Sequence, residues 1–380
     1  MVFASVGRGV AHGRGYLRSD GSPTQREKET TLPTLPYLSP GKHVVNSPHV
    51  LLLGAGASRA ACPKGDATGR VVPVMKDLID VVGLRPTLAR LGVTSGFEDF
   101  EAVYDSLVAT AADPGGLREI EESIRQYFAS LRLPVTSTVY DYSLATLRRK
   151  DLIATFNWDP FLAQAFRRNL ALRELPRIVF LHGNVAIGYC EKDEVKGWYG
   201  TLCEKCMEPL APTPLFYPVS NKNYSSNPYI ATEWGEFKSY LESAYFFTIF
   251  GYGAPKTDMA ARKVLKENWD RNPHRDLAEV EVIDIKPEAE LKASWEVFIV
   301  RQHYLTAGTF FESYQMMHPR RSCDALAGAT LENDPWKDDR MSECENLYEL
   351  RARVASLVDE ELEEVKSQRG FSRMPYPEQR

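Results

Sequence analysis

Short apolar runs alternate with polar and glycine-rich segments along the chain, and five of the runs end in a burst of small or polar residues. These runs with their bursts cover residues 49–58, 153–159, 178–183, 247–253 and 280–285. An apolar run of five or six residues bounded by glycine or polar residues is typical of a buried strand. Ligands of open parallel sheets bind at the carboxyl ends of the strands. The pattern therefore predicts an α/β fold with an open parallel sheet flanked by helices, and one crevice where the polar strand ends converge.

Helical spacing of apolar residues predicts the segments between the strands. Phe100, Val103, Tyr104 and Leu107 form one stripe in a helical insert that we expect at about 74–147, covering the crevice. Shorter helices are predicted near 161–166, 233–243 and 257–269, and the apolar stretch 295–300 is predicted as a helix or an edge strand.

Composition divides the chain into three parts. Residues 1–45 are rich in Gly, Pro, Ser, Thr and Arg, which predicts a disordered arm, because such a segment cannot bury enough apolar surface to become ordered. Residues 46–320 are predicted as one folded domain, and 183–227 as an irregular, cysteine-containing excursion from its sheet. Residues 321–380 are predicted as a charged, largely helical tail whose last helix is solvated.

The bulk numbers exclude some classes of function. A formal net charge of −5 over 380 residues argues against a general nucleic-acid-binding surface. No apolar run approaches the roughly 18 residues of a membrane span, and the amino terminus lacks the apolar core of a secretory signal. Six cysteines are too few for a disulfide scaffold. We therefore expect a cytoplasmic protein that does not bind membranes.

The tightest burst is the glycine-rich turn Gly54-Ala55-Gly56-Ala57-Ser58, which follows a predicted strand and precedes a predicted helix. In that context, glycines let the backbone approach a pyrophosphate at a helix N-terminus. Arg59 stands where a dehydrogenase fingerprint has its third glycine, and no acidic strand end follows about 20 residues later. The turn predicts nucleotide binding without hydride transfer, and a tight turn without a ligand is the alternative.

Polar side chains follow the next two predicted strands. Asn157 and Asp159 end one of them, and Asp159 before Pro160 is also typical of a helix N-cap. His182, followed by Gly183, ends the other strand. A histidine at the carboxyl end of a parallel strand is a candidate acid or base, because its unperturbed pKa lies near neutral pH.

These motifs, in this order and ending with Phe250-Gly251-Tyr252-Gly253-Ala254-Pro255, resemble the SIR2 superfamily over about residues 48–310. The chain looks most like the bacterial SIR2-like proteins of antiphage defence, and less like protein-deacetylating sirtuins. The resemblance implies a Rossmann-like domain that binds NAD as a substrate and breaks its nicotinamide–ribose bond. It further implies activation by a protein partner or by formation of a homo-oligomer.

The resemblance also assigns roles to single residues. The residues implied to hold the pyrophosphate are Gly54, Ala55, Gly56 and Ser58. Asn157 and Asp159 match the pair that touches the nicotinamide ribose, and His182 matches the catalytic histidine. Gly251 begins the segment near the adenosine, where Asp284 is a further candidate contact. Gly253 replaces a serine of the family pattern, so one hydroxyl contact is not expected here.

Three cysteines follow the histidine in the region where sirtuins carry four zinc ligands. Cys190, Cys203 and Cys206 are therefore candidate metal ligands, with Cys203 and Cys206 in a C-x-x-C spacing. The fourth ligand that a structural zinc needs is not identified from the sequence. A remnant loop with free thiols is the alternative.

The function expected from these features is hydrolysis of NAD to ADP-ribose and nicotinamide, in defence against phage. His182 would act as general base, and Asn157 would orient water or the ribose. Alternatives are an NAD-dependent protein deacylase and a non-catalytic regulator that binds NAD or ADP-ribose. A more distant alternative is a serine hydrolase, because Ser58, Asp159 and His182 follow the Ser-Asp-His chain order of α/β-hydrolases.

Overall fold

The computed structural model describes residues 46–110, 113–219, 224–253, 258–301, 303–344 and 346–366. The arm expected at 1–45, the end of the tail at 367–380 and the motif residues Ala254 and Pro255 lie outside the described residues.

Six parallel strands form the central sheet, in the order β3-β2-β1-β7-β8-β9. Their bounds are β1 His49–Leu53, β2 Leu152–Thr155, β3 Arg177–Phe180, β7 Phe246–Phe250, β8 Glu279–Ile283 and β9 Tyr304–Ala307. Counted along the chain, this is the strand order 3-2-1-4-5-6 of a Rossmann-like sheet. The predicted fold class is confirmed, and all five predicted strands are present.

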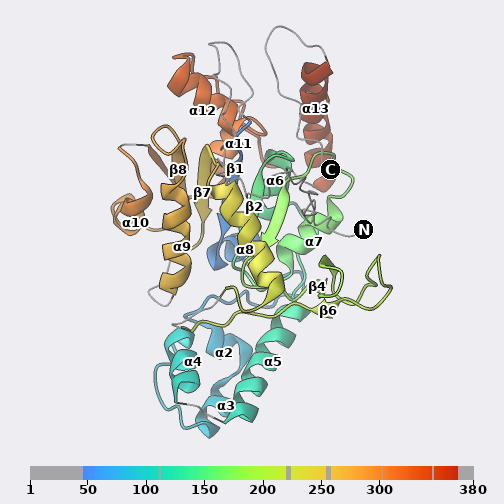
Figure 1. Ribbon diagram of the computed structural model, residues 1–380, viewed down its shortest axis with the longest axis vertical. Helices are drawn as coiled ribbons and strands as arrows, with labels where there is room; N and C mark the ends of the chain where they lie inside the picture. The colour runs from blue at the N-terminus through green and yellow to red at the C-terminus, as the bar shows by residue number, and fades with distance from the viewer. Residues whose placement is uncertain are drawn as a thin grey trace, which may run out of the picture.

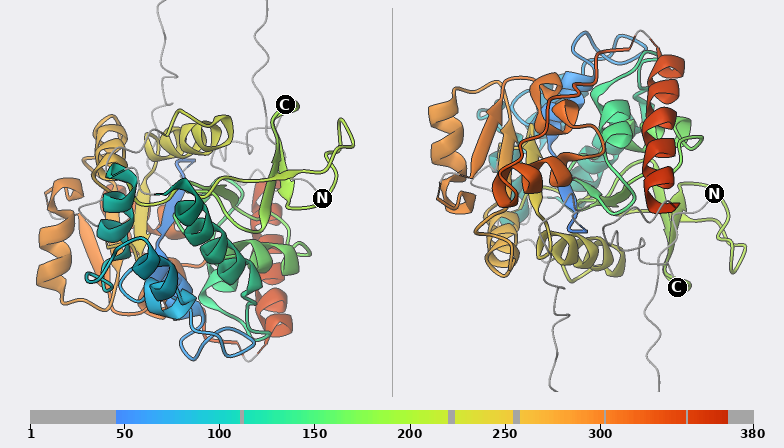
Figure 2. Two further views of the ribbon diagram at one scale, coloured as in Figure 1. Left: turned by 90° about the horizontal axis from the view of Figure 1, so that it is seen from below. Right: turned by 90° about the horizontal axis from the view of Figure 1, so that it is seen from above.

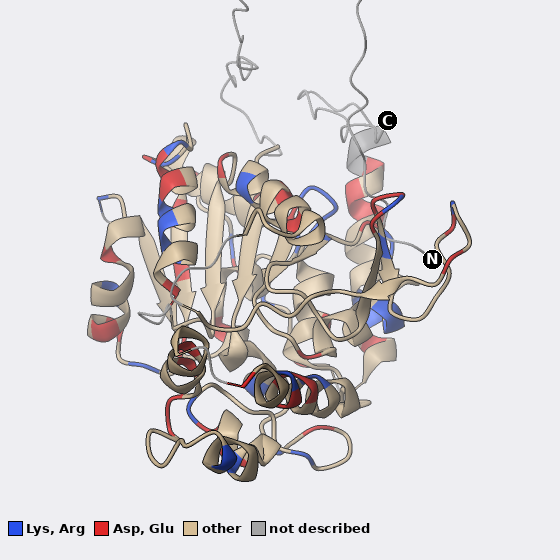
Figure 3. Cartoon of the chain, turned by 60° about the horizontal axis from the view of Figure 1, so that its bottom comes forward, with Lys and Arg blue, Asp and Glu red and all other residues tan. Residues whose placement is uncertain are grey.

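Helices cover both faces of this sheet, which explains why the strands of its centre are apolar throughout. Every residue of β1, β2, β7 and β8 is buried. On one face lie α8 (Pro228–Leu241) and α9 (Met259–Asp270), side by side in front of the sheet (Figure 1). On the other lie α1 (Ala55–Ala61), α6 (Val139–Thr146) and α7 (Phe161–Arg168) (Figure 2). In Figure 3, the strands are almost free of charged residues, and the charges lie on helices and loops.

Four helices of the predicted insert form a separate layer next to the carboxyl ends of the strands (Figures 1 and 2). They are α2 (Leu78–Val82), α3 (Arg85–Arg90), α4 (Phe100–Ala109) and α5 (Pro114–Ser130). The predicted apolar stripe on α4 is buried. The last helix of the stretch, α6, differs from the expectation because all of its residues are buried in the main core.

The excursion after β3 is more regular than its sequence indicates. It holds a three-stranded antiparallel sheet of β5 (Val195–Trp198), β4 (Ile187–Cys190) and β6 (Ala211–Pro212). These strands are too short to show an alternating pattern, which is why the sequence predicted no regular structure here.

After β8, the C-terminal part of the chain is largely helical and is interrupted by β9. It comprises α10 (Glu288–Trp295), the 3₁₀ helices η2 (Glu296–Phe298) and η3 (Phe310–Glu312), α11 (Tyr314–Met317), α12 (Ser322–Leu331) and α13 (Leu347–Lys366). The prediction of a solvated last helix was wrong for one face of α13, which buries Leu350, Val354 and Val358. Glu361 on the same helix pairs with Arg320 over 2.7 Å. Among the described residues, no helix combines the length and apolarity needed to cross a bilayer.

Candidate functional site

A pocket of about 550 Å³ lies at the carboxyl edge of the sheet, between the strand ends and the helical insert. The predicted site residues that line it are Gly54, Ala55, Gly56, Asn157, Asp159, His182, Gly251 and Asp284. The insert contributes Lys76, Leu78, Glu98, Asp99, Glu101 and Phe128. The structure thus brings all but one of the predicted nucleotide-site residues to one pocket, and the exception is Ser58.

The glycines of the first turn are needed for contact with the turn after β7. A Cβ atom on Gly54 would lie 2.5 Å from the Gly251 carbonyl oxygen, and one on Gly56 would lie 2.7 Å from Gly251 Cα. Gly251 itself has φ +63°. The N–H groups of Gly54 and Gly56 donate to the carbonyls of Phe250 and Gly251, each over 2.9 Å. The N–H of Ala55, between these two glycines, has no hydrogen-bond acceptor among the described residues.

Ser58 points away from the pocket into a buried hydrogen-bond network. Its hydroxyl donates to Asp159 Oδ2 over 2.5 Å and accepts from Asn157 Nδ2 over 2.9 Å. The Tyr140 hydroxyl lies 2.7 Å from the same oxygen. Ser58 is 1% exposed, so its side chain is not placed to contact a pyrophosphate in the pocket. Its position instead fixes the two polar residues that follow β2.

Asn157 and Asp159 are held by this network just past the end of β2. Asn157 Nδ2 also donates to the Gly54 carbonyl over 2.8 Å, so the amide group bridges the two loops. Its Oδ1 has no hydrogen-bond partner within the described part of the chain and is the atom left to act on a ligand. Asp159 Oδ1 accepts from the Phe161 N–H over 3.1 Å, but the N-cap of α7 is Pro160, so the predicted cap at Asp159 lies one residue too early. Burial raises the pKa of Asp159 to about 6, although these hydrogen bonds oppose the shift.

His182 follows β3 and lines the pocket beside Phe156. It is 6% exposed, and its ring centroid lies 4.6 Å from that of Phe156. The glycine behind it is needed for a close approach of another stretch of backbone. A Cβ atom on Gly183 would lie 1.7 Å from the Pro214 carbonyl oxygen. The absence of a side chain at Gly183 therefore lets the backbone after β6 pass close by, and it does not widen the pocket.

Three polar residues near the pocket were not singled out from the sequence. Tyr140 contacts Ser58 and Asn157, Tyr224 lies next to His182, and Asp258 accepts from the Tyr224 hydroxyl. Only the Asp258 position carried a signal, since it lies in the first turn of the helix predicted near 257–269 and comes seven residues after Gly251. Tyr140 and Tyr224 are ordinary apolar-pattern residues in the sequence, so only the folded chain distinguishes them.

At the far end of the pocket, Asp284 follows β8, and its Oδ1 accepts from the Lys286 N–H over 3.1 Å. Lys286 and Lys76 bring positive charge to the lining, whereas Glu98, Asp99 and Glu101 bring negative charge from the insert. A ligand with both cationic and anionic groups fits this mixture.

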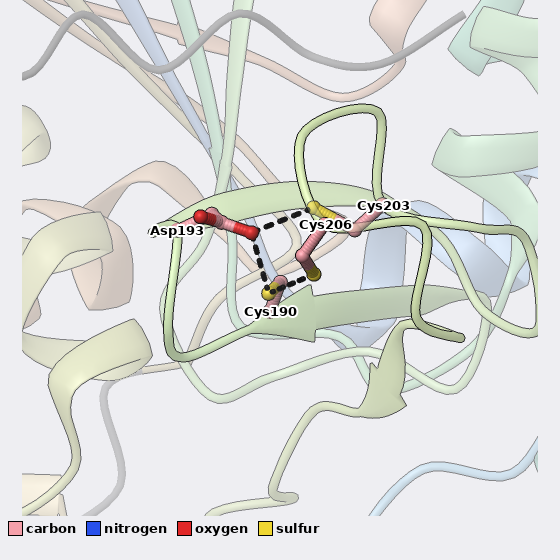
Figure 4. Close-up of side chains that lie close together, drawn as sticks. All are labelled: Cys190, Asp193, Cys203 and Cys206. Atoms are coloured by element: carbon pink, nitrogen blue, oxygen red, sulfur yellow. Dashed lines mark hydrogen bonds between the residues drawn. The ribbon is translucent and has the colours of Figure 1, made fainter.

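The cysteine cluster lies on the small antiparallel sheet and is joined by a carboxylate that sequence analysis missed. The ligand atoms of Cys190, Asp193, Cys203 and Cys206 all lie within 4.8 Å of one another and point to a common centre (Figure 4). Cys190 Sγ and Cys206 Sγ are 3.6 Å apart, close to the roughly 3.8 Å expected between two sulfurs on a tetrahedral zinc. Asp193 comes three residues after Cys190, a C-x-x-D spacing that could have identified it. Three thiols and one carboxylate fit a structural zinc site.

The contacts of Ser58 do not form a hydrolase triad. In a triad an imidazole lies between the serine and the carboxylate. Here Ser58 Oγ donates directly to Asp159, and its other partners are Tyr140 and Asn157. The buried hydroxyl is therefore a structural donor.

Comparison with known proteins gives structural likenesses only. No family model matches the sequence, and no curated protein matches it. Among solved structures, the chain resembles a Sir2 homologue–NAD complex at 12% identity and a TM-score of 0.36, covering 75% of this chain and 89% of that one. Sir2 bound to an acetylated peptide gives 13% identity and a TM-score of 0.36, over 69% and 87% of the two chains. A Sir2–p53 peptide–NAD⁺ complex gives 13% identity and a TM-score of 0.34, over 74% and 92%. Because all these TM-scores lie below 0.5, the interpretation of the site rests on the contacts within this chain.

Proposed function

We propose that this protein binds NAD in the pocket and hydrolyses its nicotinamide–ribose bond. The observation that carries the proposal is that Asn157 and His182 line one pocket together with the glycine-rich turn, at the carboxyl edge of a Rossmann-like sheet. The motif resemblance to the SIR2 superfamily supplies the substrate. The mixed charge of the lining suits a ligand with a cationic ring and a diphosphate.

The reaction needs the protein to orient the water and the ribose and to supply a base. When the bond between the ribose C1′ and the nicotinamide nitrogen breaks, its electron pair neutralises the pyridinium ring and leaves an oxocarbenium-like ribose. Water then bonds to C1′ and loses a proton, which His182 accepts, and the products are ADP-ribose and nicotinamide. Asn157 Oδ1 orients the water or a ribose hydroxyl. A positioned base contributes roughly 10²- to 10⁴-fold to such a step.

The zinc fitted by Cys190, Asp193, Cys203 and Cys206 would be structural in this proposal. It would hold the small sheet, from which the chain continues to Phe216 and Pro218 in the pocket wall. The proposed site residues need no metal.

Nicotinamide release from NAD tests the proposal. Purified protein is compared with His182→Ala, Asn157→Ala and the matched control His274→Ala, whose histidine lies outside the pocket lining. We expect wild type and His274→Ala to release nicotinamide at equal rates and the other two variants to lose at least about 10²-fold in kcat. Equal rates for wild type and His182→Ala would refute the proposal.

The alternatives give different results in the same assay. A deacylase would release nicotinamide only when an acyl-lysine peptide is added, and the peptide would lose its acyl group. A regulator would bind NAD or ADP-ribose in calorimetry without turnover. The defence role is a separate part of the proposal and follows the motif resemblance. Phage infection of bacteria that express the protein should deplete cellular NAD, and the His182→Ala variant should not deplete it.

A further inference from the structure

The glycine-rich turn offers few hydrogen-bond donors to a diphosphate. The N–H groups of Gly54 and Gly56 donate to the turn after β7, and the Ala57 N–H donates to the Gly54 carbonyl over 3.0 Å. The Ser58 hydroxyl donates to a buried carboxylate. The Ala55 N–H is left, whereas each phosphate group of NAD carries a negative charge that is best bound by a cation or by several donors. A further binding group is therefore needed in the pocket.

Two lysines, Lys76 and Lys286, bring positive charge to the described part of the pocket lining, and no arginine does. Lys286 follows β8, which lies two strands away from β1 and its glycine-rich turn. Lys76 comes from the insert, and its side chain is exposed. Within the described ranges of the chain, its ammonium group has neither a hydrogen-bond acceptor nor an ion-pair partner. Lys76 is thus a cation that is free to bind a ligand.

A tight turn at 74–77 carries Lys76. The Asp77 N–H donates to the Val74 carbonyl over 3.0 Å, and Asp77 Oδ1 accepts from the Val74 N–H over 2.7 Å. Val74, Met75 and Lys76, the residues that these two bonds enclose, all line the pocket. The position of the Asp77 carboxylate therefore determines where the turn presents Lys76.

Arg59 joins this carboxylate to the helix that begins at the glycine-rich turn. It lies on the last turn of α1, and its Nη2 donates to Asp77 Oδ2 over 2.7 Å. The two side chains are 40% and 28% exposed, and Arg59 itself does not line the pocket. The residue that occupies the place of the third glycine in a dehydrogenase fingerprint thus ties the turn at 74–77 to α1, next to the first glycines.

We propose that Lys76 binds the diphosphate of the ligand, and that Arg59 is a positioning residue that holds Lys76 at the pocket through Asp77. The inference rests on the proposed binding of NAD. It goes beyond that function, because it assigns the charge that binds the phosphates to the insert and explains the arginine after the glycine-rich turn. An exposed ion pair is weak by itself, so the effect of Arg59 is the smaller of the two.

Calorimetry with ADP-ribose tests the binding role without requiring turnover. Lys76→Met should weaken the Kd about 10-fold, because it removes a charge-assisted contact. The matched control is Lys64→Met, an exposed lysine of the same loop outside the pocket lining, which should bind like wild type. Added salt should weaken binding to wild type more than to Lys76→Met, since salt screens the contact that the variant lacks. A merely structural role of Lys76 would leave this salt dependence unchanged.

The positioning role of Arg59 is tested by combining variants. Arg59→Met should weaken the Kd for ADP-ribose about 3-fold, and Arg59→Lys should bind like wild type, because a lysine can still pair with Asp77. The double variant Arg59→Met/Lys76→Met should bind no more weakly than Lys76→Met alone, since Arg59 acts through Lys76. The control is Arg90→Met, whose exposed pair with Glu119 lies on the insert outside the pocket lining. Additive losses in the double variant would overturn the positioning role.

Nicotinamide release by the same proteins separates this inference from the proposed function. Lys76→Met should raise KM about 10-fold with kcat changed less than about 3-fold, because Lys76 does not touch the reacting atoms. If wild type releases nicotinamide and Lys76→Met keeps its KM and its Kd, the inference fails and the function stands. If Lys76→Met loses affinity for ADP-ribose but wild type releases no nicotinamide, the inference stands and the function fails. Absence of ADP-ribose binding to wild type would overturn the inference.

Discussion

Ser58 and Asp159 share a buried hydrogen bond of 2.5 Å, from the serine hydroxyl to Oδ2 of the carboxylate. The two side chains are 1% and 3% exposed; Ser58 lies on α1, which follows β1, and Asp159 lies in the segment after β2. The bond therefore ties two strand ends together beneath the pocket. Because Asp159 is buried without a cationic partner in the contacts described for it, desolvation raises its pKa to about 6.

A raised pKa on Asp159 makes the protein less stable as pH rises. Between about pH 4 and 6 the folded state binds a proton at Asp159 that the unfolded chain has released, so the free energy of unfolding falls with pH in this window. The shift from 3.8 to about 6 corresponds to about 3 kcal/mol. The Asp159→Asn variant lacks this term. Its stability relative to wild type should rise by about 3 kcal/mol between pH 4 and pH 7, measured by urea unfolding at each pH. Parallel pH profiles for the two proteins would show that Asp159 does not titrate this way.

Gly251 should not tolerate a side chain, whereas its near neighbour Gly253 should. A Cβ atom on Gly251 would lie 2.4 Å from the Ala57 backbone nitrogen, and the backbone has φ +63°. A Cβ atom on Gly253 meets nothing within 4 Å. We expect Gly251→Ala to lose about 3 kcal/mol of unfolding free energy or to fail to fold, from overpacking and strain together. Gly253→Ala should stay within about 0.5 kcal/mol of wild type. Similar losses for both variants would contradict the close approach of the two turns.

Much of the fold could be predicted from the sequence because the central strands are buried on both faces. Each appears as a continuous apolar run with polar residues at its end, as in the run before Gly54. The short strands around Tyr189 and Val195 escaped prediction, since a four-residue strand carries too little alternation. The burial of one face of α13 was not predicted either, because the sequence of a highly charged helix does not indicate which part of the chain its few apolar residues contact.

For the site, the sequence predicted which residues lie at the pocket better than it predicted what their side chains contact. Strand ends converge by topology, so Asn157 and His182 reach one pocket as expected. Which way a side chain turns after the strand ends is set by packing, and Ser58 turns inward. Glycines give the same sequence signal whether a ligand or another backbone approaches them, which is why the contact between Gly56 and Gly251 was not foreseen.

The cysteine cluster predicts one zinc ion per chain, bound by Asp193 and three cysteines. Mass spectrometry of the purified metal-loaded protein should give a zinc-to-chain ratio near one. Cys206→Ser and Asp193→Ala should lower the ratio, since structural zinc is four-coordinate. Cys344→Ser is the matched control, because this partly buried cysteine lies outside the cluster. A chelator should lower the melting temperature of wild type and control more than that of Cys206→Ser. A ratio near zero for wild type would favour the alternative of free thiols.

The small sheet is further fixed to the main domain by the buried pair of Lys196 on β5 and Glu233 on α8. Lys196 Nζ lies 2.8 Å from Glu233 Oε1 and also donates to the Ile178 carbonyl over 2.9 Å. Glu233 Oε2 accepts from the Phe180 N–H over 2.7 Å. The pair thus connects β5, β3 and α8 next to the loop that carries His182. Desolvation raises the pKa of Glu233 despite the neighbouring ammonium group, so the carboxylate depends on Lys196 for its charge.

Removing one partner of this pair should cost more than removing both. Lys196→Met leaves Glu233 buried without its cation and should lose about 3 to 5 kcal/mol of unfolding free energy. In the double variant with Glu233→Gln, the glutamine oxygen still accepts from the Phe180 N–H and no charge is buried, so part of the loss should be recovered. The exposed pair Lys263–Glu267, 3.8 Å apart, is the control, and Lys263→Met should change stability by less than about 0.5 kcal/mol. Urea unfolding of wild type, Lys196→Met, Glu233→Gln and the double variant gives the coupling energy, with Lys263→Met measured beside them. Additive losses would mean that Glu233 does not need the ammonium group, and that the position of the small sheet depends on backbone contacts alone.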